Sequence, residues 1–187
     1  AAFILKKQFR FLGETGLLKR WLDRLTRVLH PRSRRIPITA TVRKGGLSLK
    51  VFESLEEIKR LKDIWDPLLE KSQVNSIFMT YEWVLSWLES YGEDKDIMVL
   101  GAYKKDRLIG LCPLIINKKK FIFRPVRTVE FAGSPQTDRA DFIISKNTEE
   151  VLELFRDYLW EQRSRWTVIR LKEIDASSFN LTAFGNL

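Results

Sequence analysis

The sequence predicts a mixed α/β (α+β) fold in which a mostly antiparallel sheet is flanked by helices, with an amphipathic helix at the N-terminus. Three observations predict it. Strand-like and helix-like segments alternate after the turn signal Gly45-Gly46, and two of the strand-like segments are joined by a connection short enough for a hairpin. The composition, with 44% apolar and 30% charged residues, provides a packed core and a hydrated surface. At 187 residues, we expect one domain with an appendage.

Charge divides the chain into two parts. Residues 1–48 hold 12 Lys or Arg against two acids, a balance of +10, whereas residues 49–187 hold 21 basic and 22 acidic side chains, a balance of −1. We therefore predict a basic amphipathic N-terminal segment over residues 1–46 and a folded domain over residues 47–187.

The basic segment contains a predicted amphipathic helix over residues 15–30. Thr15 can cap its first turn, and His30 precedes a proline that ends it. Its apolar residues recur at spacings of three and four, and Lys or Arg fill most of the other face. Three interpretations stay open. We favour docking onto the domain or a partner, ahead of binding to an anionic membrane surface, where each basic residue contributes about 1 kcal/mol. A targeting peptide is the third.

The first half of the predicted domain contains one strand and two helices. The strand covers residues 49–53. Ser54 then opens a Ser-x-x-Glu capping box, which predicts a helix that runs to about residue 71. A second helix opens near Thr80 and keeps its apolar residues at helical spacing until Gly92 ends it.

The second half is richer in strands. Residues 97–103 and 107–116 alternate like strands and are joined by a three-residue connection, which predicts a hairpin. Three further strands, a helix and a last strand follow, and no closing element is predicted after them. In chain order these elements cover residues 118–123, 127–131, 141–144, 148–162 and 167–172.

Five short motifs occur in a defined order between residues 49 and 178. They are Trp65-Asp66-Pro67-Leu68-Leu69, Ser76-Ile77-Phe78-Met79-Thr80-Tyr81-Glu82-Trp83, Arg107-Leu108-Ile109-Gly110-Leu111-Cys112-Pro113-Leu114, Val129-Glu130-Phe131-Ala132-Gly133 and Asp138-Arg139-Ala140-Asp141-Phe142. Together they resemble the N-terminal half of the CelD-like, Fem-related acyltransferases of the GNAT superfamily.

The resemblance implies a function for a longer parent protein. It implies a bacterial protein of two GNAT-like lobes, of which this chain is the N-terminal one, that moves an acyl group from acetyl-CoA or another acyl-CoA to an amine or sugar acceptor. Precursors of the cell envelope or of exopolysaccharide are acceptors of this class. A single cysteine, Cys112, is consistent with a reducing cytoplasm, and residues 15–30 would allow peripheral contact with the inner membrane.

The sequence departs from this pattern at the expected cofactor loop. An acyl-CoA cradle needs backbone N–H groups at a helix N-terminus, usually offered by a glycine-rich loop after a strand. Here that loop would be residues 132–139. Its only glycine is Gly133, and the loop precedes a predicted strand instead of a helix. We therefore expect acyl-CoA to bind mainly to the second lobe. We expect no catalysis from this chain alone and assign no catalytic or cofactor-binding residue.

Four residues are candidates for binding the acceptor. Asp138 and Asp141 adjoin a turn at the end of the predicted sheet, where a carboxylate could hold a substrate amine or take its proton. The structural alternative is that these two carboxylates cap the turn. Tyr81 and Glu82 start the second predicted helix, and in similar proteins this stretch lines the groove between the lobes.

Other classes of site are poorly supported. The chain has one histidine, His30, and one cysteine, so the usual ligands for zinc and the usual catalytic triads cannot be assembled. Lys118, Lys119, Lys120 and Arg124 could meet the phosphates of CoA or of a lipid-linked sugar, or could simply form a solvated hairpin. Two functional alternatives also remain. One is a Fem-type transferase that uses aminoacyl-tRNA, with the basic segment contacting tRNA phosphates; the other is a non-catalytic adaptor for a membrane or a protein.

Overall fold

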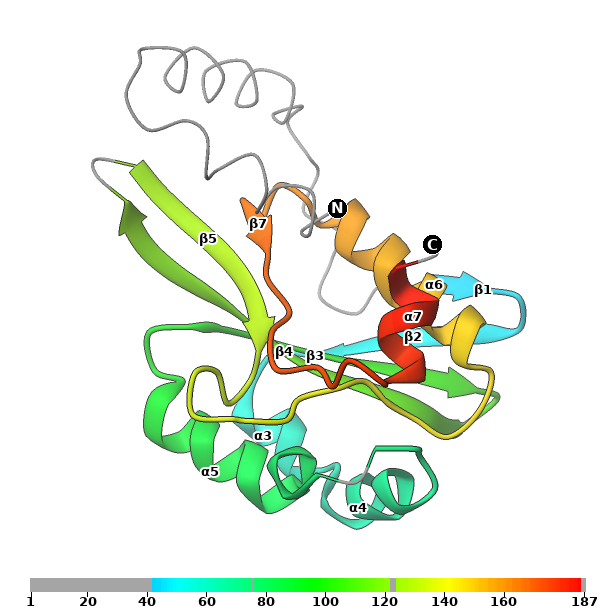
Figure 1. Ribbon diagram of the computed structural model, residues 1–187. Coiled ribbons are helices and arrows are strands. Elements are labelled where there is room, and N and C mark those ends of the chain that lie inside the picture. The colour runs from blue at the N-terminus through cyan, green and yellow to red at the C-terminus, as the bar shows by residue number, and fades with distance from the viewer. Residues whose placement is uncertain (1–41, 75, 122–123, 186–187) are drawn as a thin grey trace.

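The computed structural model describes residues 42–74, 76–121 and 124–185 (Figure 1). Within them the strands form one sheet in the order β1-β2-β3-β4-β5-β7, and β6 pairs with a separate part of β4. All described pairs are antiparallel except β5–β7. The strands are β1 Val42–Lys44, β2 Leu47–Phe52, β3 Asp96–Lys104, β4 Arg107–Phe121, β5 Arg124–Phe131, β6 Ile143–Ile144 and β7 Val168–Ile169.

Helices flank the sheet, as the sequence predicts, and the structure places them on both of its faces (Figure 1). Figure 1 shows α3, α4 and α5 on one side of the sheet and α6 and α7 on the other. Gly110 of β4 allows α6 to pack closely, because a Cβ there would lie 2.7 Å from Val151 Cγ1. The helices are α3 Leu55–Lys59, α4 Lys62–Glu70, the 3-10 turn η1 Ile77–Met79, α5 Tyr81–Tyr91, α6 Thr148–Glu161 and α7 Phe179–Gly185.

Several local predictions are confirmed. Strands β3 and β4 form the expected hairpin, with Lys105 at a φ of 54° in its turn. The capping box at Ser54 forms, because Glu57 N–H donates to Ser54 Oγ (3.3 Å) and Glu53 N–H donates to Glu57 Oε2 (2.9 Å). Helices α5 and α6 begin within one residue of the predicted starts.

Other element boundaries were predicted wrongly. The helix predicted from residue 54 to residue 71 is two helices, because the chain turns at Arg60-Leu61 between α3 and α4. Strand β4 continues through residue 117 to Phe121 as one element, since Asn117 pairs with Thr128 and nothing interrupts the ladder. A closing helix, α7, also exists where none was predicted.

The predicted helix over residues 15–30 lies outside the described residues. Strand β1, which the predicted division assigns to the N-terminal segment, pairs with β2 across Gly45 and Gly46, whose φ values are 58° and 79°. The division at residue 46 otherwise stays a prediction. No helix in the described part of the chain is long and apolar enough to cross a bilayer.

Candidate functional site

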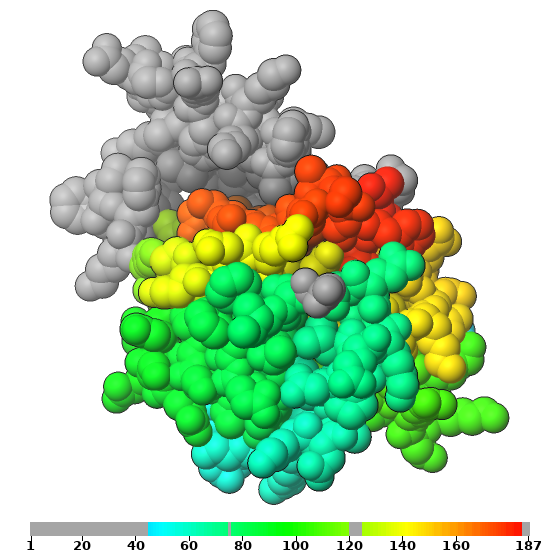
Figure 2. Space-filling view, turned by 60° about the horizontal axis from the view of Figure 1, so that its bottom comes forward, coloured from blue at the N-terminus to red at the C-terminus, as the bar shows by residue number. Residues whose placement is uncertain are grey.

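The loop over residues 132–142 connects β5 to β6 and carries two of the predicted site residues. It lies between the α4–α5 region and the C-terminal segment, where Figure 2 shows it as a yellow band between green and orange-red. Three hydrogen bonds hold it to the α5 side. The indole N–H groups of Trp83 and Trp87 donate to Thr137 Oγ1 (3.3 Å) and Gln136 Oε1 (3.0 Å), and Ser76 Oγ donates to the Arg139 carbonyl (2.8 Å).

Gly133 allows the loop to turn back under Trp83. Its φ is +102°, a conformation that L side chains rarely adopt, and a Cβ there would lie 2.1 Å from Thr137 Oγ1. The turn is closed by Thr137 N–H, which donates to the Gly133 carbonyl (3.0 Å). A glycine is therefore required at this position on grounds of both space and backbone conformation.

A cavity lies beyond the carboxyl ends of the parallel strands β5 and β7. The two strands pair at Thr128–Val168 and Val129–Ile169, and further along, Ala140 N–H from the loop donates to the Glu173 carbonyl (2.9 Å). Ligands of open sheets commonly bind beyond the carboxyl ends of such strands. The space measures about 240 Å³, and we call it the polar cavity. Its lining is Gln73, Val74, Ser76, Arg139, Ala140, Asp141, Asp175, Ser177, Ser178, Phe179 and Asn180.

Asp141 lines the polar cavity, but its carboxylate is occupied by hydrogen bonds within the chain. Oδ1 accepts from Phe142 N–H (2.7 Å) and from Asn180 Nδ2 (3.0 Å), and Oδ2 accepts from Ser178 Oγ (2.6 Å). The residue is buried, with 9% of its surface exposed. A carboxylate bound in this way fixes the loop to the start of α7, a structural role that differs from the turn cap considered from the sequence.

Asp175 is the second acid of the cavity and is equally engaged. It accepts hydrogen bonds from Ser177 Oγ (2.6 Å) and Ser177 N–H (2.9 Å), and it pairs with Arg139 (2.8 Å). The two hydrogen bonds from Ser177 hold the pKa of the Asp175 carboxyl well below its ordinary value of 3.8, and the hydrogen bond from Arg139 lowers this pKa further. Asp175 is therefore an ionised, hydrogen-bonded wall of the cavity and a poor proton acceptor.

The other predicted site residues lie around the cavity without lining it. Asp138 is exposed and makes no hydrogen bond or ion pair with the residues that the structure describes. Tyr81 is buried in the α4–α5 packing, edge-on to Trp65, and burial raises the pKa of its hydroxyl. Glu82 is exposed in the first turn of α5. The structure thus brings the two predicted regions side by side, but of the four residues only Asp141 lines the cavity.

Asp66 has a role that the sequence did not reveal. Its Oδ1 accepts from Tyr81 N–H (2.9 Å), which places a carboxylate at the N-terminal end of α5. Burial raises the pKa of the Asp66 carboxyl, and the negative charge of nearby Glu82 raises it further. Asp66 belongs to the first resemblance motif, yet its partner is 15 residues away.

A second polar group braces the sheet beside the loop. Glu130 of β5 is 3% exposed, and its carboxylate accepts from Asn117 Nδ2 (3.1 Å) on β4 and from Arg170 Nε (3.0 Å) after β7. Arg170 also pairs with the same carboxylate through Nη2. This arrangement ties β4, β5 and the segment after β7 together.

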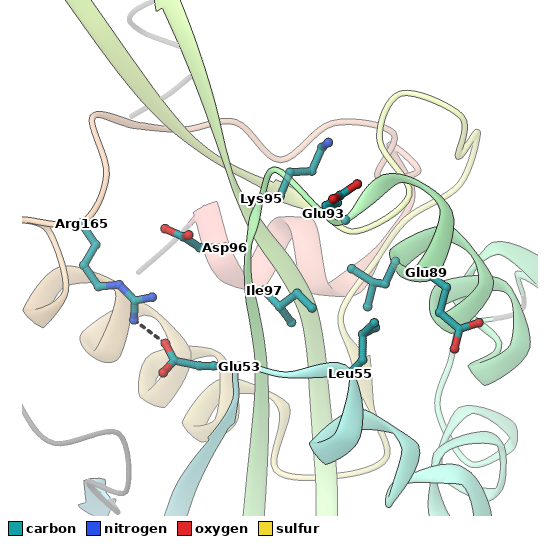
Figure 3. A pocket seen from close by; sticks show the side chains of 10 residues that line it. Glu53, Leu55, Glu89, Glu93, Lys95, Asp96, Ile97 and Arg165 are labelled. Atoms are coloured by element: carbon teal, nitrogen blue, oxygen red, sulfur yellow. Dashed lines mark hydrogen bonds and ion pairs between the residues drawn. The ribbon is translucent and has the colours of Figure 1, made fainter.

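A second cavity, of about 610 Å³, lies at the C-terminal end of α5, and we call it the acidic cavity (Figure 3). Leu55 and Ile97 lie near its centre in Figure 3, between Asp96 and Glu53 on one side and Glu89 and Glu93 on the other. Arg165 closes one side through an ion pair with Glu53 (2.6 Å). Its full lining is Glu53, Leu55, Leu88, Glu89, Gly92, Glu93, Lys95, Asp96, Ile97 and Arg165.

The junction between β6 and α6 does not fit the pyrophosphate of acyl-CoA. At this junction a strand leads directly into a long helix, and the backbone N–H groups at the start of such a helix are the groups that could bind a phosphate. The first turn of α6 carries Glu149 and Glu150, and Asn147 before it donates to Glu150 Oε1 (3.3 Å). Because acids already occupy the positive end of this helix, a further anion is disfavoured there. We therefore derive no chemical step through acyl-CoA in this chain.

No family model matches this sequence, and no curated protein matches it either. Among solved structures, the chain is similar to a ribosomal-protein-alanine N-acetyltransferase from Brucella melitensis biovar Abortus, with 10% identity, a TM-score of 0.45, and 75% of this chain and 89% of that chain covered. It is also similar to an aminoglycoside acetyltransferase from an uncultured soil metagenomic sample, with 9% identity, a TM-score of 0.44, and coverage of 76% and 88%.

A further similar structure is a GNAT family acetyltransferase from Staphylococcus aureus, with 16% identity, a TM-score of 0.37, and 72% of this chain and 90% of that chain covered. All three neighbours are acetyltransferases.

Proposed function

We propose that this chain is the acceptor-binding lobe of a two-lobe acyltransferase of the GNAT type, CelD-like and Fem-related, in which acyl-CoA binds mainly to a second lobe. The acceptor in this proposal is an amine or a sugar, such as a cell-envelope or exopolysaccharide precursor. The protein would act in a bacterial cytoplasm. The single observation that carries the proposal is the polar cavity beyond the carboxyl ends of β5 and β7.

The lining of the polar cavity suits a hydroxyl-rich or cationic ligand. Hydroxyls of Ser177 and Ser178, the amide of Asn180, and charges of both signs face a space of about 240 Å³, which is large enough for one sugar ring. Exposed Asp138 follows directly on the part of the loop held by Trp83 and can attract an ammonium group. These groups support recognition of an acceptor.

The same lining offers little for proton transfer. A general base must be free to accept the proton that it removes, whereas Asp141 and Asp175 already accept hydrogen bonds from their neighbours. The acidic first turn of α6 argues in addition against CoA at the described strand–helix junction. Both features support an assignment of binding to this lobe and of acyl-donor binding to another part of the parent protein.

Calorimetric titration of the 187-residue chain tests this assignment, with glucosamine as the acceptor probe and acetyl-CoA as the donor probe. We expect millimolar binding of glucosamine and no binding of acetyl-CoA. Asp138→Asn should weaken glucosamine binding about fivefold, since it removes a negative charge that attracts the ammonium group. Asp106→Asn, an exposed acid in the β3–β4 turn, is the matched control. Micromolar binding of acetyl-CoA, or glucosamine binding that Asp138→Asn leaves unchanged, would contradict the proposal.

The acyl donor of the parent protein separates the proposal from the aminoacyl-tRNA alternative. Full-length protein is incubated with an amino sugar and either radiolabelled acetyl-CoA or radiolabelled aminoacyl-tRNA. Label transferred from acetyl-CoA supports the proposal. Transfer from aminoacyl-tRNA alone assigns the protein to the Fem-type class, and transfer from neither leaves a non-catalytic adaptor as the better description.

A further inference from the structure

The acidic cavity combines an apolar floor with a rim of carboxylates. Leu55, Leu88 and Ile97 form the apolar part, and Glu53, Glu89, Glu93 and Asp96 surround it (Figure 3). Lys95 and Arg165 are the basic residues in the lining, so the lining keeps an excess of negative charge. An apolar floor within an acidic rim matches a basic amphipathic helix, whose apolar stripe and basic flanks are complementary to it.

Part of this negative charge is not neutralised by the domain. Glu53 pairs with Arg165 (2.6 Å), Glu89 with Lys59 (3.1 Å) and Asp96 with Lys118 (2.5 Å). Glu93 is exposed and makes no ion pair with any residue that the structure describes.

The surrounding helical layer is acidic as a whole. Residues 53–96 hold 11 acidic and 5 basic side chains, a balance of −6, opposite to the balance of +10 in residues 1–48. The two parts of the chain are therefore electrostatically complementary, and the cavity lies in the acidic part.

The direction of the chain at the start of the described residues leads toward this cavity. In the antiparallel pair β1–β2, Lys44 lies opposite Leu47 and Val42 lies opposite Leu49. At Val42 the chain, followed toward its N-terminus, therefore points along β2 toward Glu53, which lies about 13 Å beyond Leu49 at 3.3 Å per residue. The stretch from His30 to Val42 can extend over at most about 40 Å, which is enough to reach the cavity.

We propose that the predicted amphipathic helix over residues 15–30 docks into the acidic cavity of the same chain. Trp21 and Leu25, on the apolar stripe, would meet the floor formed by Leu55, Leu88 and Ile97. Lys19 and the arginines of the helix would meet the acidic rim. The docked helix fills a cavity separate from the polar cavity, so this contact does not depend on the proposed acyltransferase function.

Carbodiimide coupling of amines to carboxylates tests the contact, because it links only groups that already touch. Lys19 is the only lysine in residues 15–30, so its cross-links can be identified by peptide mass spectrometry. In dilute monomer we expect Lys19 to be coupled to acids of the cavity rim. The double variant Trp21→Asp with Leu25→Asp keeps the lysine and the tether, yet should lower the yield more than tenfold because apolar burial is lost.

A charge-reversal pair provides the matched control. Glu93→Lys should lower coupling to the remaining rim acids about threefold, whereas Glu149→Lys, an exposed acid in the first turn of α6, should leave it unchanged. Equal effects of the two variants would overturn the proposal, as would cross-links found only in a dimer, which would make a second copy the occupant. Tight binding of the chain to anionic phospholipid vesicles together with no rim cross-links would assign residues 15–30 to a membrane and overturn it as well.

Discussion

The polar cavity and the acidic cavity are both lined by carboxylates, but they differ in what those carboxylates contact. In the polar cavity, Asp141 accepts three hydrogen bonds from the chain and Asp175 pairs with Arg139. In the acidic cavity, Glu93 is exposed and has no such partner among the described residues. The acids of the polar cavity therefore maintain its shape, whereas the acidic cavity retains a negative charge that can pair with a basic group from another molecule or from the tethered N-terminal segment.

The largest expected effect comes from the turn that shapes the polar cavity. Gly133→Ala places a Cβ 2.1 Å from Thr137 Oγ1 at a φ of +102°, so we expect a loss of about 3 kcal/mol in the free energy of unfolding. Urea denaturation followed by tryptophan fluorescence measures it. Gly45→Ala has a positive φ but nothing within 4 Å, and should cost only about 1 kcal/mol. Equal losses in the two variants would show that the turn at Gly133 is not tightly packed.

Asp141→Ala tests whether this carboxylate is structural. Removing it takes away the acceptor of Ser178 Oγ and one of the two acceptors of Asn180 Nδ2, which keeps only its hydrogen bond to the Phe142 carbonyl (2.8 Å). We expect a loss of about 2 kcal/mol in the free energy of unfolding, because buried donors lose their partner. Thermal unfolding with far-UV circular dichroism is a suitable measurement. If the stability were unchanged, the carboxylate of Asp141 would not be structural, and its interpretation as a residue that binds the acceptor would be favoured.

A smaller, pH-dependent effect is expected at Asp175. Because its folded-state pKa lies below the ordinary 3.8, the ionised group stabilises the fold at pH values above about 4, and this contribution is lost as the pH falls. Asp175→Asn should therefore have a lower melting temperature than the parent at pH 7, and the gap should narrow between pH 4 and pH 2. A gap that is constant over this range would mean that Ser177 and Arg139 do not hold the carboxylate as described.

The smallest effect on stability is expected at Glu93, the acid of the acidic cavity that has no ion pair within the described part of the chain. Glu93→Gln should change the free energy of unfolding by less than about 0.5 kcal/mol, since an exposed side chain without a partner contributes little to folding. Chemical denaturation at low and high salt provides the measurement. A loss comparable to that of Asp141→Ala would remove the contrast between the two cavities.

Local elements were predictable because their signals lie within a few residues. The capping box at Ser54 depends on Glu57 three residues away, and the β3–β4 hairpin depends on a short connection between alternating segments. The break between α3 and α4 was missed, because the apolar spacing runs on through Arg60-Leu61 and no proline or glycine marks the turn there.

The candidate site was only partly predictable. Asp141 was expected near a turn at the end of the sheet and does line a cavity there, but its partners Ser178 and Asn180 are 37 and 39 residues away. Glu130 and Arg170, separated by 40 residues, gave no local sign that they would pair.

By itself, the sequence determined the mostly antiparallel sheet flanked by helices, the positions of α5 and α6, and the contrast between a basic segment and a neutral domain. Those properties follow from apolar periodicity and helix caps, which depend on residues close together in the sequence, and from net charge, which is a sum over side chains. Only the tertiary structure decided that α7 would close the domain, with Phe184 stacked on Phe142, and which carboxylates would be bound and which left free. The reason is that a buried carboxylate is stabilised by whichever donors the folded chain brings within hydrogen-bonding distance, and those donors come from distant segments.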